Sequence, residues 1–147
     1  MLITKPEIAN LIPHTGAMCL LDGVLEWDAT HITCVSTSHR DENNPMRIAG
    51  QLPALCGIEY AAQAMAIHGG LAGVVGKKPR AGYLAGLRDV ACWVSRLDDL
   101  AGDLTIHAEQ VMGDASLAIY QFSLTAGSVE IIQGRATVVL DVDGAAP

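Results

Sequence analysis

Glu59 and Gln63 are the polar pair with the clearest chemical potential in this sequence. They stand four residues apart in an otherwise apolar stretch, so a helix places them one turn apart on the same face. An ionised carboxylate in such a setting costs several kcal/mol unless it is paired or protonated. Perturbed carboxylates occur at catalytic sites, but a hydrogen bond from Gln63 or from a backbone amide would also satisfy Glu59 structurally. The pattern therefore leaves a catalytic and a structural carboxylate open.

Pro53 stands at a plausible first position of the same helix. Because the first amides of a helix have no intrahelical acceptor, the N–H groups of Ala54 and Leu55 are expected to be available. Such amides can stabilise a developing oxyanion, for example that of a polarised thioester carbonyl. We predict Pro53, Ala54 and Leu55 as an oxyanion and substrate-binding group, although every helix has an N-terminus.

The helix that carries these residues is expected to run from about Pro53 to His68 and to end at Gly69-Gly70. It is apolar on nearly every side, which is typical of a helix enclosed by other structure. Tyr60 is expected in the core, with the wall of a substrate tunnel as the alternative. His68 is expected to cap the end of the helix, where a positive charge suits the helix dipole.

Strands are predicted on both sides of this helix by β-branched residues and by apolar–polar alternation. A short helical turn at residues 5–13, two strands within 17–39 and a polar loop at 40–51 are expected first. Four strands follow the helix, at residues 82–94, 103–113, 116–127 and 129–142. This order predicts an α+β fold in which a mostly antiparallel sheet wraps around one long helix, and it disfavours a doubly wound nucleotide-binding fold.

The composition narrows the class of protein. A chain of 147 residues, 50% of them hydrophobic, has room for one domain, residues 1–147. A net charge of -7 with few aromatic residues argues against a nucleic-acid surface. The longest apolar stretch, residues 52–75, includes a Glu, a Gln and a His, which a membrane-spanning helix would rarely carry. The N-terminus lacks a basic segment followed by an apolar run, so a cytoplasmic protein is expected.

No metal site is predicted. The cysteines Cys19, Cys34, Cys56 and Cys92 have neither CxxC spacing nor a His at zinc-finger spacing, so free buried thiols are expected. None of the histidines has a second ligand at metal spacing. His14, His31 and His107 are expected to have structural roles.

The order of several motifs resembles the bacterial 3-hydroxyacyl-(acyl-carrier-protein) dehydratases, which have the hotdog fold. In that family a His-Phe-Pro-Gly loop and a Met-Pro-Gly turn lead into a central helix carrying Glu-x-x-x-Gln. Here Leu52-Pro53-Ala54 is followed by Glu59 and Gln63, and the segments IPHTGAMCLLDGV, GYLAGLRDVACW and GRATVVL are similar to the family's flanking segments. IPHxGAMCLLD, LPAxCGIEYAAQAMAIHG and GYLAxxRDV are most similar to the dehydratase-like subunit of aryl-polyene biosynthesis. The resemblance covers nearly the whole chain and implies a 3-hydroxyacyl thioester dehydratase, a hydro-lyase.

The sequence departs from the family at the catalytic histidine. Counted back from Glu59, the family's His falls on Pro45, and Ala54 replaces the oxyanion Gly. The elimination needs a base for the α-proton and an acid for the departing hydroxyl. A rearranged loop could bring in His39. Alternatively, because each site of the family takes its His and its carboxylate from different subunits, a paralogue that retains the His could form a heterodimer in which Glu59 is this chain's contribution.

The resemblance also implies the substrate and the partners. The acyl group would be carried on the phosphopantetheine of an acyl carrier protein or on coenzyme A, with no further cofactor. Lys77, Lys78 and Arg80 form the densest basic cluster and could receive the acidic carrier, although a solvated face is the commoner role of such a run. A homodimer or a heterodimer is expected, because pairing removes an exposed sheet edge. A hotdog acyl thioesterase and a non-catalytic subunit of a dehydratase heterodimer remain as alternatives.

Overall fold

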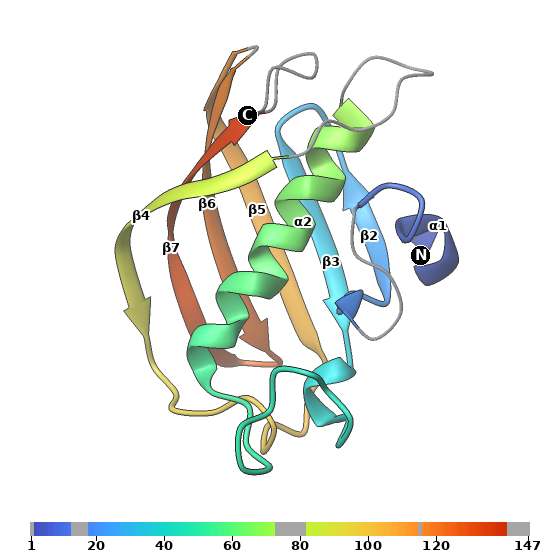
Figure 1. Cartoon of the computed structure of the whole chain (residues 1–147), viewed down its shortest axis with the longest axis vertical. Helices are drawn as coiled ribbons and strands as arrows, with labels where there is room; N and C mark the ends of the chain where they lie inside the picture. Colours follow the sequence, from blue (N-terminus) through green and yellow to red (C-terminus); the bar gives the residue numbers. More distant parts are fainter. Residues whose placement is uncertain (1, 13–17, 73–81, 115, 141–147) are drawn as a thin grey trace.

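The computed structural model describes residues 2–12, 18–72, 82–114 and 116–140. Within them, an antiparallel sheet of seven strands curves around one long helix, α2 (Gly57–Ala72), in the strand order β1-β2-β3-β5-β6-β7-β4 (Figure 1). The strands are β1 (Ile3–Thr4), β2 (Gly23–Trp27), β3 (His31–Ser36), β4 (Gly82–Cys92), β5 (Leu104–Gly113), β6 (Leu117–Ala126) and β7 (Val129–Leu140). The predicted α+β architecture is confirmed, and β1 is a strand that the sequence pattern missed.

The sheet buries one of its faces against α2. Along β3, for example, Ile32, Cys34 and Ser36 are buried and the residues between them are half-exposed, as the two-residue period of a strand requires. The helix lies close to the sheet at Gly57, where an added Cβ would meet the side chains of Leu124 and Ile132 at 3.1 Å. A residue without a side chain therefore lets the start of α2 lie against β6 and β7.

The helical region differs from the prediction at both ends. A 3-10 turn, η3 (Ala54–Cys56), precedes α2, so the α-helix begins four residues after Pro53. The predicted end at His68 is wrong, since α2 continues through the glycine pair to Ala72. Each glycine lowers helix propensity by about 1 kcal/mol, but Ile67 and His68 are fully buried, and this packing outweighs the local preference.

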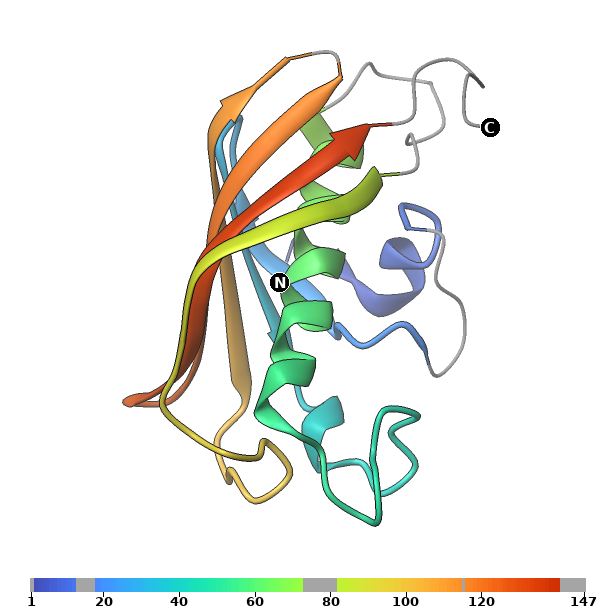
Figure 2. The ribbon, with the colours of Figure 1, turned by 60° about the vertical axis from the view of Figure 1, so that its left-hand side comes forward.

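The N-terminal helix α1 (Lys5–Ile8) lies on the same side of the sheet as α2 (Figure 2). A second short 3-10 turn, η2 (Ser38–Arg40), follows β3. No described helix is long and apolar enough to span a lipid bilayer.

Strand β4 forms one edge of the sheet and pairs only with β7 among the described strands. Large apolar side chains on β4 and just after it are strongly exposed: Tyr83, Leu84, Leu87, Val90 and Trp93. An unpaired edge that also exposes apolar surface is a site for pairing with another chain.

Candidate active site

The chain that leads into η3 and α2 is held by a hydrogen bond to an ion-paired carboxylate. The Leu52 amide donates to Asp98 Oδ1 at 2.8 Å, and Asp98 is ion-paired with Arg96. The pKa of the Asp98 carboxyl is held well below its usual range, chiefly by the hydrogen bond from the Arg96 guanidinium and to a smaller extent by that from the Leu52 amide. The chain just before η3 is thereby fixed to the segment between β4 and β5.

The two amides predicted to bind a substrate oxyanion differ in the structure. The Ala54 amide donates to the Ser95 carbonyl at 3.1 Å, because Pro53 and Arg96 form a short antiparallel bridge. The Leu55 amide has no acceptor among the described residues, and Leu55 is 61% exposed. Of the pair, the Leu55 amide is the one open to a ligand.

Glu59 and Gln63 are brought together as their spacing predicts. Glu59 is half-buried in the first turn of α2, and Gln63 Nε2 lies 3.5 Å from its Oε1. Gln63 is fully buried and is held from the other side, where Nε2 donates to the Met18 carbonyl at 2.7 Å and Oε1 accepts from the Leu20 amide at 2.9 Å. The segment before β2 therefore fixes the glutamine that touches the carboxylate.

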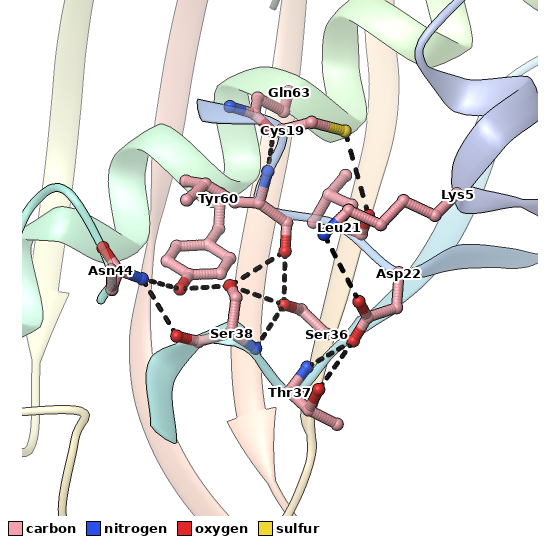
Figure 3. Close-up of polar contacts among 11 residues, drawn as sticks. Lys5, Cys19, Leu21, Asp22, Ser36, Thr37, Ser38, Asn44, Tyr60 and Gln63 are labelled. Carbon is pink, nitrogen blue, oxygen red and sulfur yellow. Dashed lines mark hydrogen bonds and ion pairs between the residues drawn. The ribbon is translucent and has the colours of Figure 1, made fainter. Parts of the chain in front are cut away.

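Tyr60 is fully buried and is also the centre of a polar network (Figure 3). Its hydroxyl lies 2.7 Å from Ser38 Oγ and accepts from Asn44 Nδ2 at 3.1 Å. Ser38 Oγ and Ser36 Oγ both donate to the Leu20 carbonyl, at 2.9 and 2.5 Å. The sequence offered no signal for Ser36, Ser38 or Asn44, because they meet Tyr60 only through the tertiary fold.

The loop that carries Pro45 is held in one conformation by hydrogen bonds. Asn44 is 5% exposed, whereas Pro45 beside it is exposed. The Arg47 guanidinium donates to the carbonyls of Asp41 and Gly50 at 2.9 and 2.8 Å, and to the His39 carbonyl at 3.3 Å. Ala49 adopts φ +51, which a non-glycine residue rarely does. The position that carries the His in the resembling family is thus an exposed proline in a well-fixed loop.

His39 lies in η2 and is fully buried. Its Nε2 donates to the Leu100 carbonyl at 3.0 Å, and Nδ1 has no partner among the described residues. Burial lowers the pKa of His39. In this conformation the imidazole is directed to the connection between β4 and β5, so a catalytic role for His39 stays a prediction that needs a loop rearrangement.

The other histidines occupy structural positions where they are described. The prediction that His68 caps the helix is wrong: it is fully buried, with Nδ1 2.7 Å from the Tyr120 hydroxyl and Nε2 donating to the Asp28 carbonyl at 3.0 Å. Burial lowers the pKa of His68. His31 and His107 lie on β3 and β5, as predicted. Across residues 2–12, 18–72, 82–114 and 116–140, no cluster of three or more His, Cys, Asp or Glu could hold a metal ion.

The predicted carrier-docking residues Lys77, Lys78 and Arg80 lie outside the described residues, as does His14. Arg96, which could join the basic cluster, is engaged with Asp98. Arg88 is exposed on β4, directly opposite Arg135 of β7.

An antiparallel sheet wrapped around a central helix, with a carboxylate in the helix's first turn, defines the hotdog class that the sequence resemblance predicted. The model of the ApeP-like family, described as ApeP dehydratase, matches residues 6–145, so this chain belongs to the ApeP-like dehydratase family. The match confirms the predicted assignment to a dehydratase family.

Solved structures share the fold. The dehydratase heterocomplex ApeI:P from Xenorhabdus doucetiae matches with a TM-score of 0.81 and 24% identity over 92% of this chain and 91% of that chain. Thioesterase HI1161 from Haemophilus influenzae matches with a TM-score of 0.67 and 13% identity over 99% and 100% of the two chains. A hypothetical thioesterase with coenzyme A from Streptococcus pneumoniae matches with a TM-score of 0.58 and 13% identity over 80% and 84%. No curated protein sequence matches this chain.

Proposed function

We propose that this chain is the carboxylate-bearing subunit of a dehydratase that removes water from a 3-hydroxyacyl thioester in aryl-polyene biosynthesis. The observation that carries the proposal is Glu59, half-buried in the first turn of α2 and contacted by the fully buried Gln63. Pro45 stands where the resembling dehydratases have their histidine, so the chain supplies one of the two required groups.

In the substrate, the elimination breaks the C2–H and C3–O bonds and forms the C2=C3 π bond. A base removes the C2 proton, the electron pair of that bond forms the C2=C3 double bond, and the C3–O bond breaks. The hydroxyl leaves as water after receiving a proton from an acid. In our proposal a histidine of the partner takes the C2 proton, the carboxyl group of Glu59 gives its proton to the departing hydroxyl and becomes a carboxylate, and the Leu55 amide stabilises the negative charge on the thioester oxygen.

The surface of the chain supports a partner subunit. The edge strand β4 exposes apolar side chains, and the less buried face of α2 carries Glu59, Ala62 and Ala66. A second hotdog subunit pairing along β4 would extend the sheet, cover this surface and approach Glu59. The ApeI:P structure, which this chain resembles in fold, is a dehydratase heterocomplex. We propose the same arrangement here, with a partner that retains the histidine.

The acyl group is proposed to arrive on the phosphopantetheine arm of an acyl carrier protein, or on coenzyme A, with no other cofactor. An acidic carrier needs a local basic surface, because the chain has a net charge of -7. Lys77, Lys78 and Arg80 are the proposed docking residues.

A dehydration assay tests the proposal. The purified chain alone, the chain mixed with a His-retaining dehydratase paralogue, and the same mixture with Glu59→Gln would each receive a 3-hydroxyacyl carrier-protein thioester. We expect trans-2-enoyl product from the wild-type mixture and its loss with Glu59→Gln, whereas Glu26→Gln, an exposed carboxylate change on β2, leaves turnover intact. The paralogue alone, assayed in parallel, sets the background.

Three results would contradict the proposal. Turnover by the chain alone, abolished by His39→Ala, would make His39 the base and remove the need for a partner. Full turnover of the Glu59→Gln mixture would make the chain a non-catalytic subunit. Release of free acyl acid instead of the enoyl thioester would identify a thioesterase.

A further inference from the structure

The buried network around Tyr60 has a directed order of donors and acceptors (Figure 3). The Asn44 amide donates both to the Ser38 carbonyl at 3.0 Å and to the Tyr60 hydroxyl at 3.1 Å. Since Ser38 Oγ donates to the Leu20 carbonyl at 2.9 Å, the proton of the Tyr60 hydroxyl is directed to Ser38 Oγ at 2.7 Å. Ser38 Oγ also lies 2.9 Å from Ser36 Oγ, and whether Ser38 donates to Leu20 or to Ser36, each donor has an acceptor and the Tyr60 proton points to Ser38.

The same network continues to the carboxylate. Leu20 is held at its carbonyl by Ser38 and, at 2.5 Å, by Ser36. The amide of Leu20 donates to Gln63 Oε1, and Gln63 Nε2 lies 3.5 Å from Glu59 Oε1. Tyr60 is adjacent to Glu59 in sequence, yet its hydroxyl is connected to the carboxylate by a path that leaves α2, crosses two other segments and returns to it.

The hydroxyl of Tyr60 is the part of this side chain that packing does not require. Tyr60 is fully buried, and a phenylalanine ring would occupy nearly the same volume. Burying a hydroxyl lowers the stability of the fold unless the hydroxyl is hydrogen-bonded. Here it joins the loop residue Asn44 to Ser38, so one oxygen fixes two segments against the helix.

We infer that Tyr60 is a positioning residue for Glu59: its hydroxyl, acting through Ser38 and Leu20, fixes Gln63 and thereby the orientation of the carboxylate. This inference rests on the proposed function of Glu59. Displacement of a reacting group by a fraction of an ångström lowers the rate of the chemical step, while substrate binding elsewhere is unaffected. The inference therefore predicts a loss in kcat at unchanged KM.

Tyr60→Phe and Ser38→Ala test this, each assembled with the His-retaining partner and assayed as described above. The matched control is Tyr120→Phe, which also removes the hydroxyl of a nearly buried tyrosine, 2.7 Å from His68 Nδ1; among the described residues no hydrogen-bond path joins this hydroxyl to Gln63. Size-exclusion chromatography and near-UV circular dichroism identify the folded, assembled fraction, to which kcat is normalised.

We expect Tyr60→Phe and Ser38→Ala each to lower kcat by about tenfold with KM unchanged, and Tyr120→Phe to keep the wild-type kcat. A kcat for Tyr60→Phe within about twofold of wild type, or an equal loss in Tyr120→Phe, would overturn the inference. Glu59→Gln separates the two proposals. If it abolishes turnover while Tyr60→Phe does not lower it, the positioning role alone fails; if it leaves turnover intact, the proposed function fails.

Discussion

Replacement of Gln63 by methionine gives a sharp test of how the site is held together. Methionine has nearly the same length and shape as glutamine, so the packing of this fully buried side chain is preserved. What is lost is the pair of hydrogen bonds to the Leu20 amide and the Met18 carbonyl, at 2.9 and 2.7 Å. The substitution therefore isolates the polar attachment of the segment before β2.

The expected loss of stability follows from those two groups. A buried amide left without an acceptor costs about 1–3 kcal/mol, and the Leu20 amide becomes such a group. The Met18 carbonyl adds less, since under-satisfied carbonyls are better tolerated. Burying the apolar methionine side chain in place of the glutamine amide offsets about 1 kcal/mol of this loss of stability. The net decrease in the free energy of unfolding is about 2 kcal/mol, which lowers Tm by about 4–8 °C in a chain of this length.

Urea unfolding and thermal melts of Gln63→Met and wild type, at one protein concentration, measure this decrease. Gln121→Met, on the exposed face of β6, is the matched control and should lie within about 0.5 kcal/mol of wild type. If the unfolding midpoints of Gln63→Met and Gln121→Met coincide, the two hydrogen bonds of Gln63 do not stabilise the fold and the reasoning is refuted.

Three further predictions concern packing, pH and assembly. Gly57→Val should destabilise the chain by about 1–3 kcal/mol in urea unfolding because its side chain would collide with the sheet, whereas Gly69→Ala, with no atom within 4 Å of the added Cβ, should stabilise it by about 0.5–1 kcal/mol. Burial lowers the pKa of His68 from 6.5 in the folded chain. The stability that the neutral imidazole contributes is therefore fully present above pH 6.5 and is lost as the pH falls through the lowered pKa. Urea unfolding at about pH 7.5 and about pH 5.5 should show lower stability at the acidic pH, with a smaller difference in His68→Gln. Leu87→Asp on the β4 edge should abolish co-elution with the partner in size-exclusion chromatography, and Leu25→Asp on β2 should not, although both leucines are exposed; equal behaviour of the two would argue against pairing along β4.

Periodicity made most of the fold predictable. β-branched residues and apolar–polar alternation predicted β2 to β7, and in β3 and β6 every second side chain is buried on one face. The unbroken apolar segment predicted the enclosed helix. The spacing of Glu59 and Gln63 predicted their contact for the same local reason, since residues four apart share a helix face.

Features that depend on distant segments were not predictable. The end of α2 passed the glycine pair because burial against the sheet outweighed local propensity. The Ala54 amide found an acceptor in Ser95, 41 residues later in the chain, through the bridge between Pro53 and Arg96. His68 was buried against Tyr120 and not placed at a helix end.

The sequence by itself determined the class of fold, the carboxylate and its glutamine, and the absence of the family's histidine at Pro45, because each is written in local spacing and in motif order. The tertiary structure alone decided which amide at the start of α2 stays open, where His39 is directed, and that Tyr60 connects with Ser38 and Asn44. Hydrogen bonds between segments far apart in the chain depend on the exact approach of folded elements, and no local pattern encodes that approach.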